Sequence, residues 1–313
     1  MSEFDHIVGR SKPMEDVYRQ IRQAAATDIP VLLIGETGTG KDVVARSIHA
    51  RSGRCEGPFT AVNLGALPKE LVASELFGHR KGAFTGATEE RKGKFELAHD
   101  GTIFLDEIAS INEKVQVSLL RLLERKEFRR LGGQEKIKTN ARLIAASNQD
   151  LSDEVEEGNF REDLYYRLDV FRISLPPLRE RPGDIPLLIE EFLNRYNNRF
   201  EKSVEGISPE AVGLLESSEW SGNVRELKNV IQRAVMVCDS NVLRPEHLPP
   251  RFRDSSPARP SVTFEVGTAL EEVEREMIIR TLDYTHDNRT RTAKLLGISR
   301  RTLYNKLEEY KIA

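Results

Sequence analysis

The sequence is poor in the features that mark secreted, membrane-spanning or metal-binding proteins. It has two cysteines, Cys55 and Cys238, which lie far apart and outside any metal-ligand spacing, as expected of free thiols in a reducing cytoplasm. No apolar run approaches the roughly 20 residues that a membrane span needs. The first residues lack the basic-then-apolar pattern of a signal peptide. These absences predict a cytoplasmic protein with no membrane partner.

A large excess of one charge sign is absent as well. The net charge of −3 argues against a uniformly basic nucleic-acid binder, although a local basic patch is compatible with it. The chain instead has 313 residues with 39% hydrophobic and 31% charged side chains, which is typical of a globular protein. That length predicts two or three domains rather than a single core.

A glycine-rich stretch at residues 35–41 is the feature around which the chain is organised. An apolar run at 31–34 leads into Gly-Glu-Thr-Gly-Thr-Gly-Lys, and a helical pattern follows. The glycines let backbone N–H groups point at a polyphosphate, and Lys41 adds positive charge at the β- and γ-phosphates. Asp42 stands where Ser or Thr usually meets Mg²⁺, so a plain strand-to-helix turn is the alternative. The predicted nucleotide-binding residues here are Gly35, Glu36, Thr37, Gly38, Thr39, Gly40, Lys41, Asp42 and Val43.

Polar side chains end three further apolar runs. Asp106 and Glu107 end one of them, and Asn63 and Asn148 end the other two. Parallel sheets meet their ligands at the carboxyl ends of the strands. One acid can hold the Mg²⁺ shell while the other polarises the water that attacks the γ-phosphate, so the acids predict nucleotide hydrolysis. Asn63 is either a strand-end cap or an active-site amide, and Asn148 either orients the water or caps the next helix.

Three glycines interrupt a helical start in residues 74–87. Gly82 and Gly86 bracket Phe84 and Thr85, and charged residues flank the segment on both sides. Phe84 has no apolar neighbours at helix or strand period. The segment is therefore either an ordinary turn whose Phe84 tucks inward, or a protruding loop that presents Phe84 and Thr85 to a partner.

Three arginines and the N-terminal segment indicate further contacts. Arg161 and Arg167 lie six apart, so they do not share a helix face and serve different contacts. Such arginines either form ion pairs within the chain or reach a neighbour's γ-phosphate as arginine fingers. Arg225 falls in the first turn of a predicted helix, where the dipole disfavours a cation, which indicates that it faces an anion. The segment at Ile7 and Val8 either folds over the nucleobase or only precedes a plain helix.

The end of the chain follows a linker-like stretch at 251–262 and has a helix-turn-helix pattern. Gly297 marks the turn and Ser299 the N-cap of a second helix, whose Leu303 and Leu307 face the core. Residues 287–311 hold seven Lys or Arg and three acids, a local charge of +4 that suits the DNA major groove; a solvated helical pair is the alternative. The predicted DNA-contacting residues are Arg289, Arg291, Ser299, Arg300, Arg301, Thr302, Asn305 and Lys306, of which Arg300, Arg301, Asn305 and Lys306 are expected to point outward.

Seven motifs now occur in a fixed order. They are Gly-Glu-Thr-Gly-Thr-Gly-Lys, Glu-Leu-Phe-Gly-His, Gly-Ala-Phe-Thr-Gly-Ala, Phe-Leu-Asp-Glu-Ile, Phe-Arg-Glu-Asp-Leu-Tyr-Tyr-Arg-Leu, Leu-Pro-Pro-Leu-Arg-Glu-Arg and Gly-Asn-Val-Arg-Glu-Leu. With this set the chain resembles the bacterial enhancer-binding proteins, the NtrC-like AAA+ activators of sigma-54 RNA polymerase. The resemblance covers about residues 5–245 and, as a Fis-type helix-turn-helix, about 265–313. The Gly-Ala-Phe-Thr-Gly-Ala segment is close to unique to that family.

The resemblance implies an α/β fold, with an AAA+ P-loop parallel sheet covered by helices on both faces. An α-helical lid and a small all-α helix-turn-helix domain follow. The implied domains are 1–175 for the ATPase sheet, 176–250 for the lid, 251–264 for a linker and 265–313 for the DNA-binding domain. An acidic residue at the end of the phosphate loop is usual in this family, which accounts for Asp42.

The resemblance also implies a role for each matching position. Asp106 would be the Mg²⁺-associated acid and Glu107 the water-activating acid, with Asn63 holding Glu107 in check. Asn148 would be the first sensor and Arg225 the second. The trans-acting arginines would be Arg161 and Arg167, the metal-associated acids Asp106 and Asp42, and the sigma-54 contact Gly82, Ala83, Phe84, Thr85, Gly86 and Ala87; residues 126–139 would form a second insertion loop near the pore.

The implied activity is hydrolysis of ATP with Mg²⁺, coupled to the change of sigma-54 polymerase from a closed to an open promoter complex. The implied assembly is a homo-oligomer, a hexameric ring with a dimer at rest, bound to double-stranded enhancer DNA. Most relatives carry a sensor or receiver domain before the AAA+ module, and only a few residues precede Ile7 here. Either the protein is a naturally short member, controlled by a separate regulatory protein in trans or by its own expression, or the sequence is truncated. The rival functions are a DNA-binding regulator that uses nucleotide only to assemble, and a general AAA+ unfoldase or helicase loader.

Overall fold

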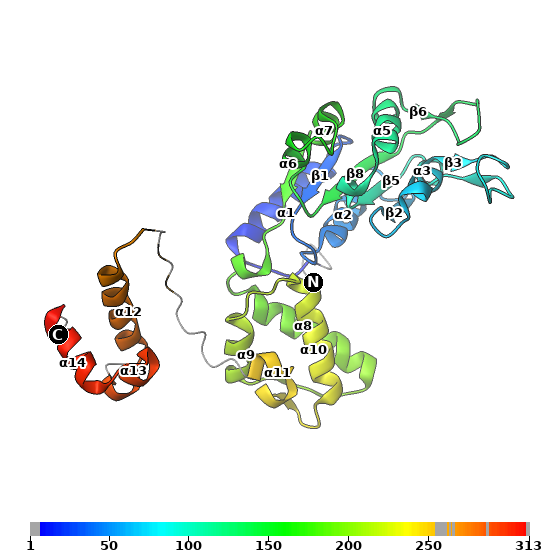
Figure 1. Cartoon of the computed structure of the whole chain (residues 1–313). Helices are drawn as coiled ribbons and strands as arrows, with labels where there is room; N and C mark the ends of the chain where they lie inside the picture. The colour runs from blue at the N-terminus through cyan, green and yellow to red at the C-terminus, as the bar shows by residue number, and fades with distance from the viewer. Residues whose placement is uncertain (1–6, 254–261, 263, 265–266, 286–287, 311–313) are drawn as a thin grey trace. The chain divides into compact units, whose positions relative to one another are not determined.

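The computed structural model describes residues 7–253, 262, 264, 267–285 and 288–310 (Figure 1). The chain divides into two units, Met1–Pro249 and Pro250–Ala313. The first unit holds a parallel sheet and a helical lid, and the described residues of the second unit form helices but no strand. No helix in the described ranges is long and apolar enough to cross a membrane.

Five parallel strands form the central sheet of the first unit, in the order β2-β5-β8-β1-β9. The four apolar runs that predict strands are confirmed, because strands buried on both faces of a sheet read as continuous apolar sequence. β9 has no counterpart among the predicted strands, since only one of its three side chains is apolar. The strands are β1 (Val31–Ile34), β2 (Phe59–Asn63), β5 (Thr102–Asp106), β8 (Arg142–Ser147) and β9 (Arg172–Ser174).

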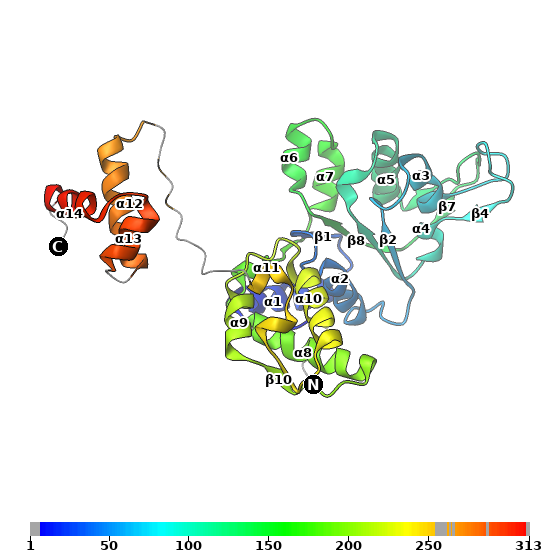
Figure 2. The ribbon, with the colours of Figure 1, turned by 60° about the horizontal axis from the view of Figure 1, so that its bottom comes forward.

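Alternate side chains of the strands point into two separate cores, one on each face of the sheet. Leu32 and Leu105 pack with helices α3 to α7, whereas Leu33 and Phe104 pack with α1 and α2. Figures 1 and 2 show these two groups of helices on opposite faces, which confirms the predicted fold. The helices are α1 (Lys12–Ala25), α2 (Lys41–Ala50), α3 (Lys69–Phe77), α4 (Lys94–Leu97), α5 (Glu113–Arg125), α6 (Leu151–Glu156) and α7 (Glu162–Leu168).

The strand register brings the polar strand ends together. Asn63, the last residue of β2, lies opposite Asp106, the last residue of β5. Ile34 of β1 lies opposite Ser147 of β8 in the same way. The phosphate loop, the two acids and the predicted amides therefore share one edge of the sheet, which we call the carboxyl edge.

The helical lid follows β9 and includes the short helical turn η2 (Leu178–Glu180). Its interior contains side chains from two long helices, among them Leu188, Phe192, Leu227 and Ile231, which are buried. The four prolines in residues 175–186 predict a connector between domains, and this stretch overlaps the start of the lid. The lid elements are α8 (Asp184–Phe200), α9 (Pro209–Glu216), α10 (Asn223–Val237), η3 (Pro245–His247) and the short paired strands β10 (Gly206–Ile207) and β11 (Val242–Leu243).

Two hairpins extend side by side from the sheet subdomain (Figures 1 and 2). Backbone hydrogen bonds join them, because the N–H of Arg80 donates to the carbonyl of Leu131 at 3.0 Å and the N–H of Leu131 donates to the carbonyl of Gly78 at 2.9 Å. The first hairpin carries residues 82–87 and the second carries residues 129–136. Their strands are β3 (Gly78–His79) with β4 (Arg91–Lys92), and β6 (Glu127–Phe128) with β7 (Ile137–Lys138).

The second unit has its own small core of helices. Leu303 and Leu307 are buried, as predicted, and pack with Ile278, Leu282 and Ala293. The apolar spacing in residues 270–282 predicts an amphipathic helix whose apolar face includes Leu270, but Leu270 is 87% exposed because it begins that helix ahead of the packed part. The predicted linker falls mostly outside the described residues. The helices are α11 (Pro250–Arg253), α12 (Leu270–Tyr284), α13 (Arg289–Leu296) and α14 (Arg300–Glu309).

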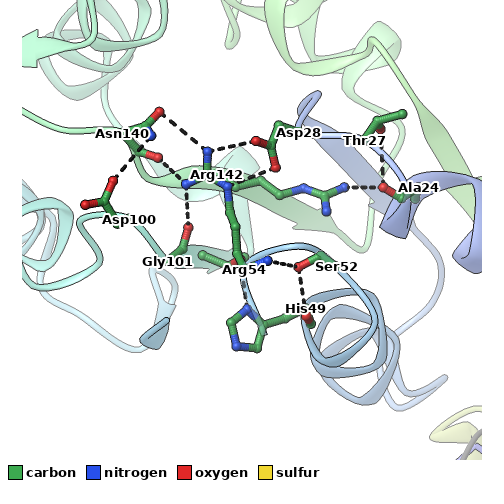
Figure 3. Close-up of polar contacts among 11 residues, drawn as sticks. Ala24, Thr27, Asp28, His49, Ser52, Arg54, Asp100, Gly101, Asn140 and Arg142 are labelled. Carbon is green, nitrogen blue, oxygen red and sulfur yellow. Dashed lines mark hydrogen bonds and ion pairs between the residues drawn. The ribbon is translucent and has the colours of Figure 1, made fainter. Parts of the chain in front are cut away.

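Two arginines form contacts at the opposite edge of the sheet, where the strands begin. We call this edge the amino edge. Arg54 forms a two-point ion pair with Asp28, both distances 2.9 Å, and donates to the carbonyl of Asn140 at 2.5 Å (Figure 3). Buried Arg142 donates to the carbonyl of Ala24 at 2.6 Å. These contacts tie the ends of α1 and α2 to the start of β8.

Candidate active site

The phosphate loop turns between β1 and α2 with two glycines in the left-handed region. The φ angles of Gly38 and Gly40 are +85° and +101°, which only glycine adopts readily. A Cβ atom at Gly38 would lie 2.2 Å from the carbonyl oxygen of Gly222, so glycine also permits the close approach of the lid. The loop therefore needs both glycines for its shape, and one of them for contact with the lid.

Lys41 lies folded into this loop. Its ammonium group donates to the carbonyls of Gly35 at 2.6 Å and Glu36 at 3.1 Å, and its side chain is buried. Burial lowers the pKa of Lys41, because a low-dielectric surrounding disfavours the charged form. A bound phosphate would give this ammonium a counter-charge, which fits the predicted role.

A cleft of about 740 Å³ opens between the carboxyl edge of the sheet and the lid. Its size suits a nucleotide-sized ligand. Most of the residues predicted to bind nucleotide line it, together with the two acids and the two predicted sensors. These lining residues are Ile7, Val8, Thr37, Gly38, Thr39, Gly40, Lys41, Asp42, Val43, Asp106, Glu107, Asn148 and Arg225.

The two acids stand at the end of β5 and line the same cleft as Lys41. Burial raises the pKa of Asp106, and Lys41 opposes that rise. Glu107 has a φ of +57°, and its carboxylate lies against Gly65, where a Cβ atom would meet Oε2 at 1.9 Å. Gly65 thus makes room for Glu107, a role that the sequence analysis missed because a single glycine between a strand and a helix carries no distinctive pattern.

Asn63 lies beside the acids, outside the lining of the cleft. Its Nδ2 lies 3.5 Å from Oδ2 of Asp106 and 3.5 Å from Oε1 of Glu107. Its Oδ1 accepts a hydrogen bond from the backbone N–H of Ala66 at 2.9 Å. Because that bond fixes the amide, the side chain presents its NH₂ group to both carboxylates.

The N-terminal segment is held at the other end of the cleft. The hydroxyl of Tyr18 donates to the carbonyls of Ile7 at 3.1 Å and Gly9 at 3.0 Å, and Arg181 donates to the carbonyl of Val8 at 2.6 Å. The segment therefore reaches the cleft as irregular chain before α1 rather than as part of a helix. This placement suits a nucleobase contact.

The lid reaches the phosphate loop through the start of α10. Arg225 lies in the first turn of that helix, as predicted, and its backbone N–H donates to the carbonyl of Gly38 at 3.3 Å. Asn223, just before it, donates from Nδ2 to the carboxylate of Glu36 at 3.0 Å and to the carbonyl of Thr37 at 3.1 Å. Asn223 is not among the site residues predicted from the sequence, although it belongs to the Gly-Asn-Val-Arg-Glu-Leu motif.

The two predicted arginine fingers lie away from the cleft lining, on or next to α7. Arg161 is 39% exposed and pairs with Asp163 at 2.7 Å, and Arg167 is 61% exposed and lies 3.7 Å from Glu124. Both arginines thus take part in ion pairs within the chain, one of the two alternatives. Their exposure leaves the other alternative, contact with a second copy, as a prediction.

The segment Gly82–Ala87 forms a tight turn at the end of the first hairpin. The N–H of Gly82 donates to the carbonyl of Ala87 at 2.8 Å, and the φ angles of Gly82 and Gly86 are +81° and +103°. Phe84 is 38% exposed, and its ring lies edge-on against His79 with centroids 5.1 Å apart. The turn therefore protrudes, while Phe84 rests on the stem of its own hairpin.

The second unit presents a helix-turn-helix surface. Ser299 caps α14 by accepting from the N–H of Thr302 at 3.0 Å, and Arg300, Arg301, Thr302 and Asn305 are exposed. Lys306 differs from its expected outward position, because it is half-buried and pairs with Glu274 of α12 at 3.0 Å. Arg289 is exposed and lies over the ring of Tyr304, 5.1 Å from its centroid. The side chain of Arg291 lies outside those that the structure describes.

The parallel sheet, the phosphate loop, the acid pair and the helical lid together define a AAA+ P-loop ATPase module. Comparison with known protein families agrees with this class. Residues 7–174 match the Sigma-54 interaction domain, residues 179–263 the AAA+ ATPase lid domain, and residues 269–310 the family described as Bacterial regulatory protein, Fis family.

Similar curated proteins cover nearly the whole chain. It is 46% identical to Regulatory protein AtoC of Escherichia coli (strain K12) over 99% of this chain and 68% of AtoC. It is 43% identical to Nitrogen fixation protein AnfA of Azotobacter vinelandii over 98% of this chain and 58% of AnfA. The structure of NtrX from Brucella abortus in complex with ADP matches with a TM-score of 0.75 and 32% identity, over 99% of this chain and 70% of that one. The chain belongs to the sigma-54-dependent transcriptional activators.

Proposed function

We propose that this protein hydrolyses ATP to ADP and phosphate in the cleft and uses that reaction to convert sigma-54 polymerase from a closed to an open promoter complex. The observation that carries the proposal is the meeting of Lys41, Asp106 and Glu107 in one cleft, within a domain that matches the sigma-54 interaction family. Lys41 would bind the phosphates, and Glu107 would polarise the attacking water.

The described residues around the cleft fit Mg²⁺ bound mainly through the nucleotide. Mg²⁺ prefers oxygen ligands and usually takes one or two protein carboxylates together with substrate phosphates. No cluster of three or more His, Cys, Asp or Glu that could hold a metal occurs among the residues that the structure describes. Asp106 and Asp42 line the same cleft as Lys41, and they would hold the ion, which neutralises phosphate charge when bound.

The contact between Asn63 and Glu107 supplies a route from the cleft to the hairpin. Asn63 ends β2, and the chain then runs through Gly65 into α3, which ends directly at β3. A carboxylate that turns toward water would leave the amide of Asn63, and residues 64–77 would carry that change to the turn at Phe84. Thr85 and its neighbours would then engage sigma-54.

The exposed arginines support a ring of identical subunits. Arg161 and Arg167 line no part of their own cleft, so they would complete the cleft of a neighbouring copy by stabilising negative charge on the γ-phosphate. We propose a hexameric ring that forms from a resting dimer. Its polymerase and DNA partners place the proposed site of action in the cytoplasm.

The test is open-complex formation by purified sigma-54 holoenzyme on a sigma-54 promoter, scored by permanganate reactivity of unpaired thymines. With ATP, the wild-type protein should form open complexes. Thr85→Ala should hydrolyse ATP and form none, whereas Thr88→Ala, an exposed threonine just beyond the turn, should behave as wild type. Normal activation by Thr85→Ala would exclude this turn as the contact. ATP hydrolysis without open complexes from the wild type would favour the DNA-binding regulator instead.

DNA binding is tested separately on the second unit. Arg301 is exposed at the start of α14, where a recognition helix reads bases. Arg301→Ala should weaken binding to the enhancer site by about 1–3 kcal/mol if it reads a base. Arg275→Ala on α12 serves as the control for loss of one positive charge. Equal affinities for both variants would move base recognition elsewhere on α14.

A further inference from the structure

The lid meets the sheet subdomain at two junctions, and the first is buried. The carboxylate of Asp184, at the start of α8, accepts from the backbone N–H groups of Arg10 at 2.7 Å and Ser11 at 2.9 Å, and from the hydroxyl of Ser11 at 2.9 Å. It also pairs with Arg181 at 2.9 Å, and the two side chains are 1% and 3% exposed. A Cβ atom at Gly9 would come within 2.6 Å of this carboxylate, so the backbone also packs tightly here. We call these residues the hinge.

The second junction joins the lid to the phosphate loop and is half-exposed. The carboxylate of Glu36 accepts two hydrogen bonds from Arg179, at 2.6 Å and 2.9 Å, and these side chains are 40% and 44% exposed. It also accepts from Nδ2 of Asn223, while Oδ1 of Asn223 accepts from the N–H of Leu178 at 2.7 Å. We call Glu36, Arg179 and Asn223 the latch.

The two junctions differ in how easily water can replace their contacts. Breaking the first junction would take the N–H groups of Arg10 and Ser11 away from the buried carboxylate of Asp184, and a buried charge that loses its hydrogen bonds is strongly unfavourable. Separating an exposed pair costs little, because water and salt take over both partners. A lid that moves as a rigid body should therefore keep the hinge and open the latch.

The latch acts on the same backbone groups that shape the phosphate loop. Asn223 binds the carbonyl of Thr37, and the N–H of Arg225 binds the carbonyl of Gly38, so the lid fixes the orientation of these two peptide groups. Glu36 joins both systems, because its carbonyl accepts from Lys41 at 3.1 Å and its carboxylate accepts from Arg179. When Lys41 turns toward a phosphate, it must leave the residue that also holds the lid.

We propose that Glu36, Arg179 and Asn223 form a latch that sets how long the nucleotide stays bound, with Asp184 and Arg181 as the hinge. Arg179 and Asn223 are positioning residues that act through the phosphate loop. With the latch closed, the loop peptides keep the orientation that binds phosphate. With the latch open, ADP leaves. The inference rests on the proposed nucleotide binding at this cleft.

The experiment follows dissociation of a fluorescent ADP analogue, mant-ADP, from the full chain by stopped flow. Arg179→Glu and Glu36→Arg should each raise the dissociation rate roughly three- to tenfold, an effect within the range measured for coupled contacts. The double exchange Glu36→Arg with Arg179→Glu should return the rate toward wild type. Asn223→Gly, which tolerates the positive φ of +51° but removes the side chain, should also speed release. The control Arg19→Glu breaks an exposed pair with Asp16 on α1 and should leave the rate unchanged.

Two results would overturn the latch. One is an Arg179→Glu rate equal to that of Arg19→Glu. The other is a double exchange that releases mant-ADP faster than either single variant, since no pairing would then be restored. A fall in melting temperature for Arg179→Glu with no change in release would assign the pair a merely structural role. If the wild type bound no mant-ADP at all, the proposed nucleotide function would fail first, which is a separate outcome.

Discussion

The two edges of the central sheet hold their charges in opposite ways. At the carboxyl edge, burial raises the pKa of Asp106 and lowers the pKa of Lys41, so each group is held where its charged form is disfavoured. At the amino edge, the hydrogen bonds between Asp28 and Arg54 lower the pKa of the acid and raise the pKa of the base. At the carboxyl edge a bound ligand would balance the charges, whereas at the amino edge Asp28 and Arg54 already balance each other.

Arg142 is the exception at the amino edge. It is 2% exposed, burial lowers its pKa, and no described residue accepts a hydrogen bond from its Nε or Nη1. Its third nitrogen still holds the carbonyl of Ala24 at the end of α1. The difference between the edges indicates that residues at the carboxyl edge serve chemistry at some cost in stability, while those at the amino edge serve stability.

The largest expected effect is at the carboxyl edge, with Glu107→Gln. Loss of a group that polarises water should reduce ATP hydrolysis by about 100-fold or more. The amide keeps the shape of the side chain, so binding of a fluorescent ATP analogue should persist. Phosphate release measures the first quantity and fluorescence titration the second. Glu56→Gln, an exposed acid in the loop before β2, is the control; equal turnover in both variants would remove Glu107 from its role.

At the amino edge, Arg54→Ala should lower stability while the specific ATPase activity of the folded protein stays at the wild-type level. Arg54 is 13% exposed and its guanidinium binds both Asp28 and the carbonyl of Asn140. Loss of these charged hydrogen bonds should cost about 2–3 kcal/mol in the free energy of unfolding of the first unit. Chemical denaturation measures it. Arg19→Ala, on the exposed face of α1, should stay within about 0.5 kcal/mol of wild type, and an equal loss there would remove the special role of Arg54.

Asp106→Asn should abolish hydrolysis and yet raise the melting temperature of the nucleotide-free protein. The pKa of Asp106 is raised on folding, so its contribution to stability is full below the unfolded pKa and declines as pH rises through the folded value. At neutral pH the carboxylate therefore opposes folding, and a neutral amide removes that opposition. The rise should be smaller than the fall in Arg54→Ala. Calorimetry at pH 7 decides it, and a lower melting temperature than wild type would contradict the comparison.

The smallest expected effect is the loss, at low pH, of the stability that the Asp28–Arg54 ion pair contributes. The pKa of Asp28 is lowered on folding, so its contribution is full above the unfolded value of 3.8 and is lost as pH falls through the lowered folded value. Asp28 is 62% exposed, which keeps the contribution small. The difference in stability between wild type and Asp28→Asn should shrink as pH falls below about 4, and it should shrink in 1 M salt at pH 7 through screening. A difference that is constant with pH would exclude the ion pair as its source.

Much of the fold could be predicted from local patterns in the sequence. The strands that end at Asn63, Asp106 and Ser147 follow from apolar runs that stop at a polar residue, and the parallel register then places those ends side by side. α14 likewise follows from the spacing of Leu303 and Leu307. β9 was not predicted, because three residues at a sheet edge are too few to show a period.

The contacts that could not be predicted all join distant parts of the chain. Glu36 meets Arg179 across 143 positions, and Asn223 meets Glu36 across 187. Nothing in the spacing of single charged residues indicates which partner each will find. Lys306 shows the same limit, because its position on α14 suits DNA, whereas its ion pair with Glu274 depends on how α12 packs.

The paired hairpins have a mechanical consequence. A single hairpin is attached to its domain at one place, so a force on its tip bends it easily. Here Arg80 bonds to Leu131 through the backbone and to Glu135 through an ion pair at 2.7 Å, while Arg130 pairs with Glu90. The first hairpin is joined to α3 and the second to α5. The contacts between the hairpins therefore make them a single unit that is attached to the domain at two points. A conformational change at the carboxyl edge would then move Phe84 together with both hairpins, rather than bend a single loop.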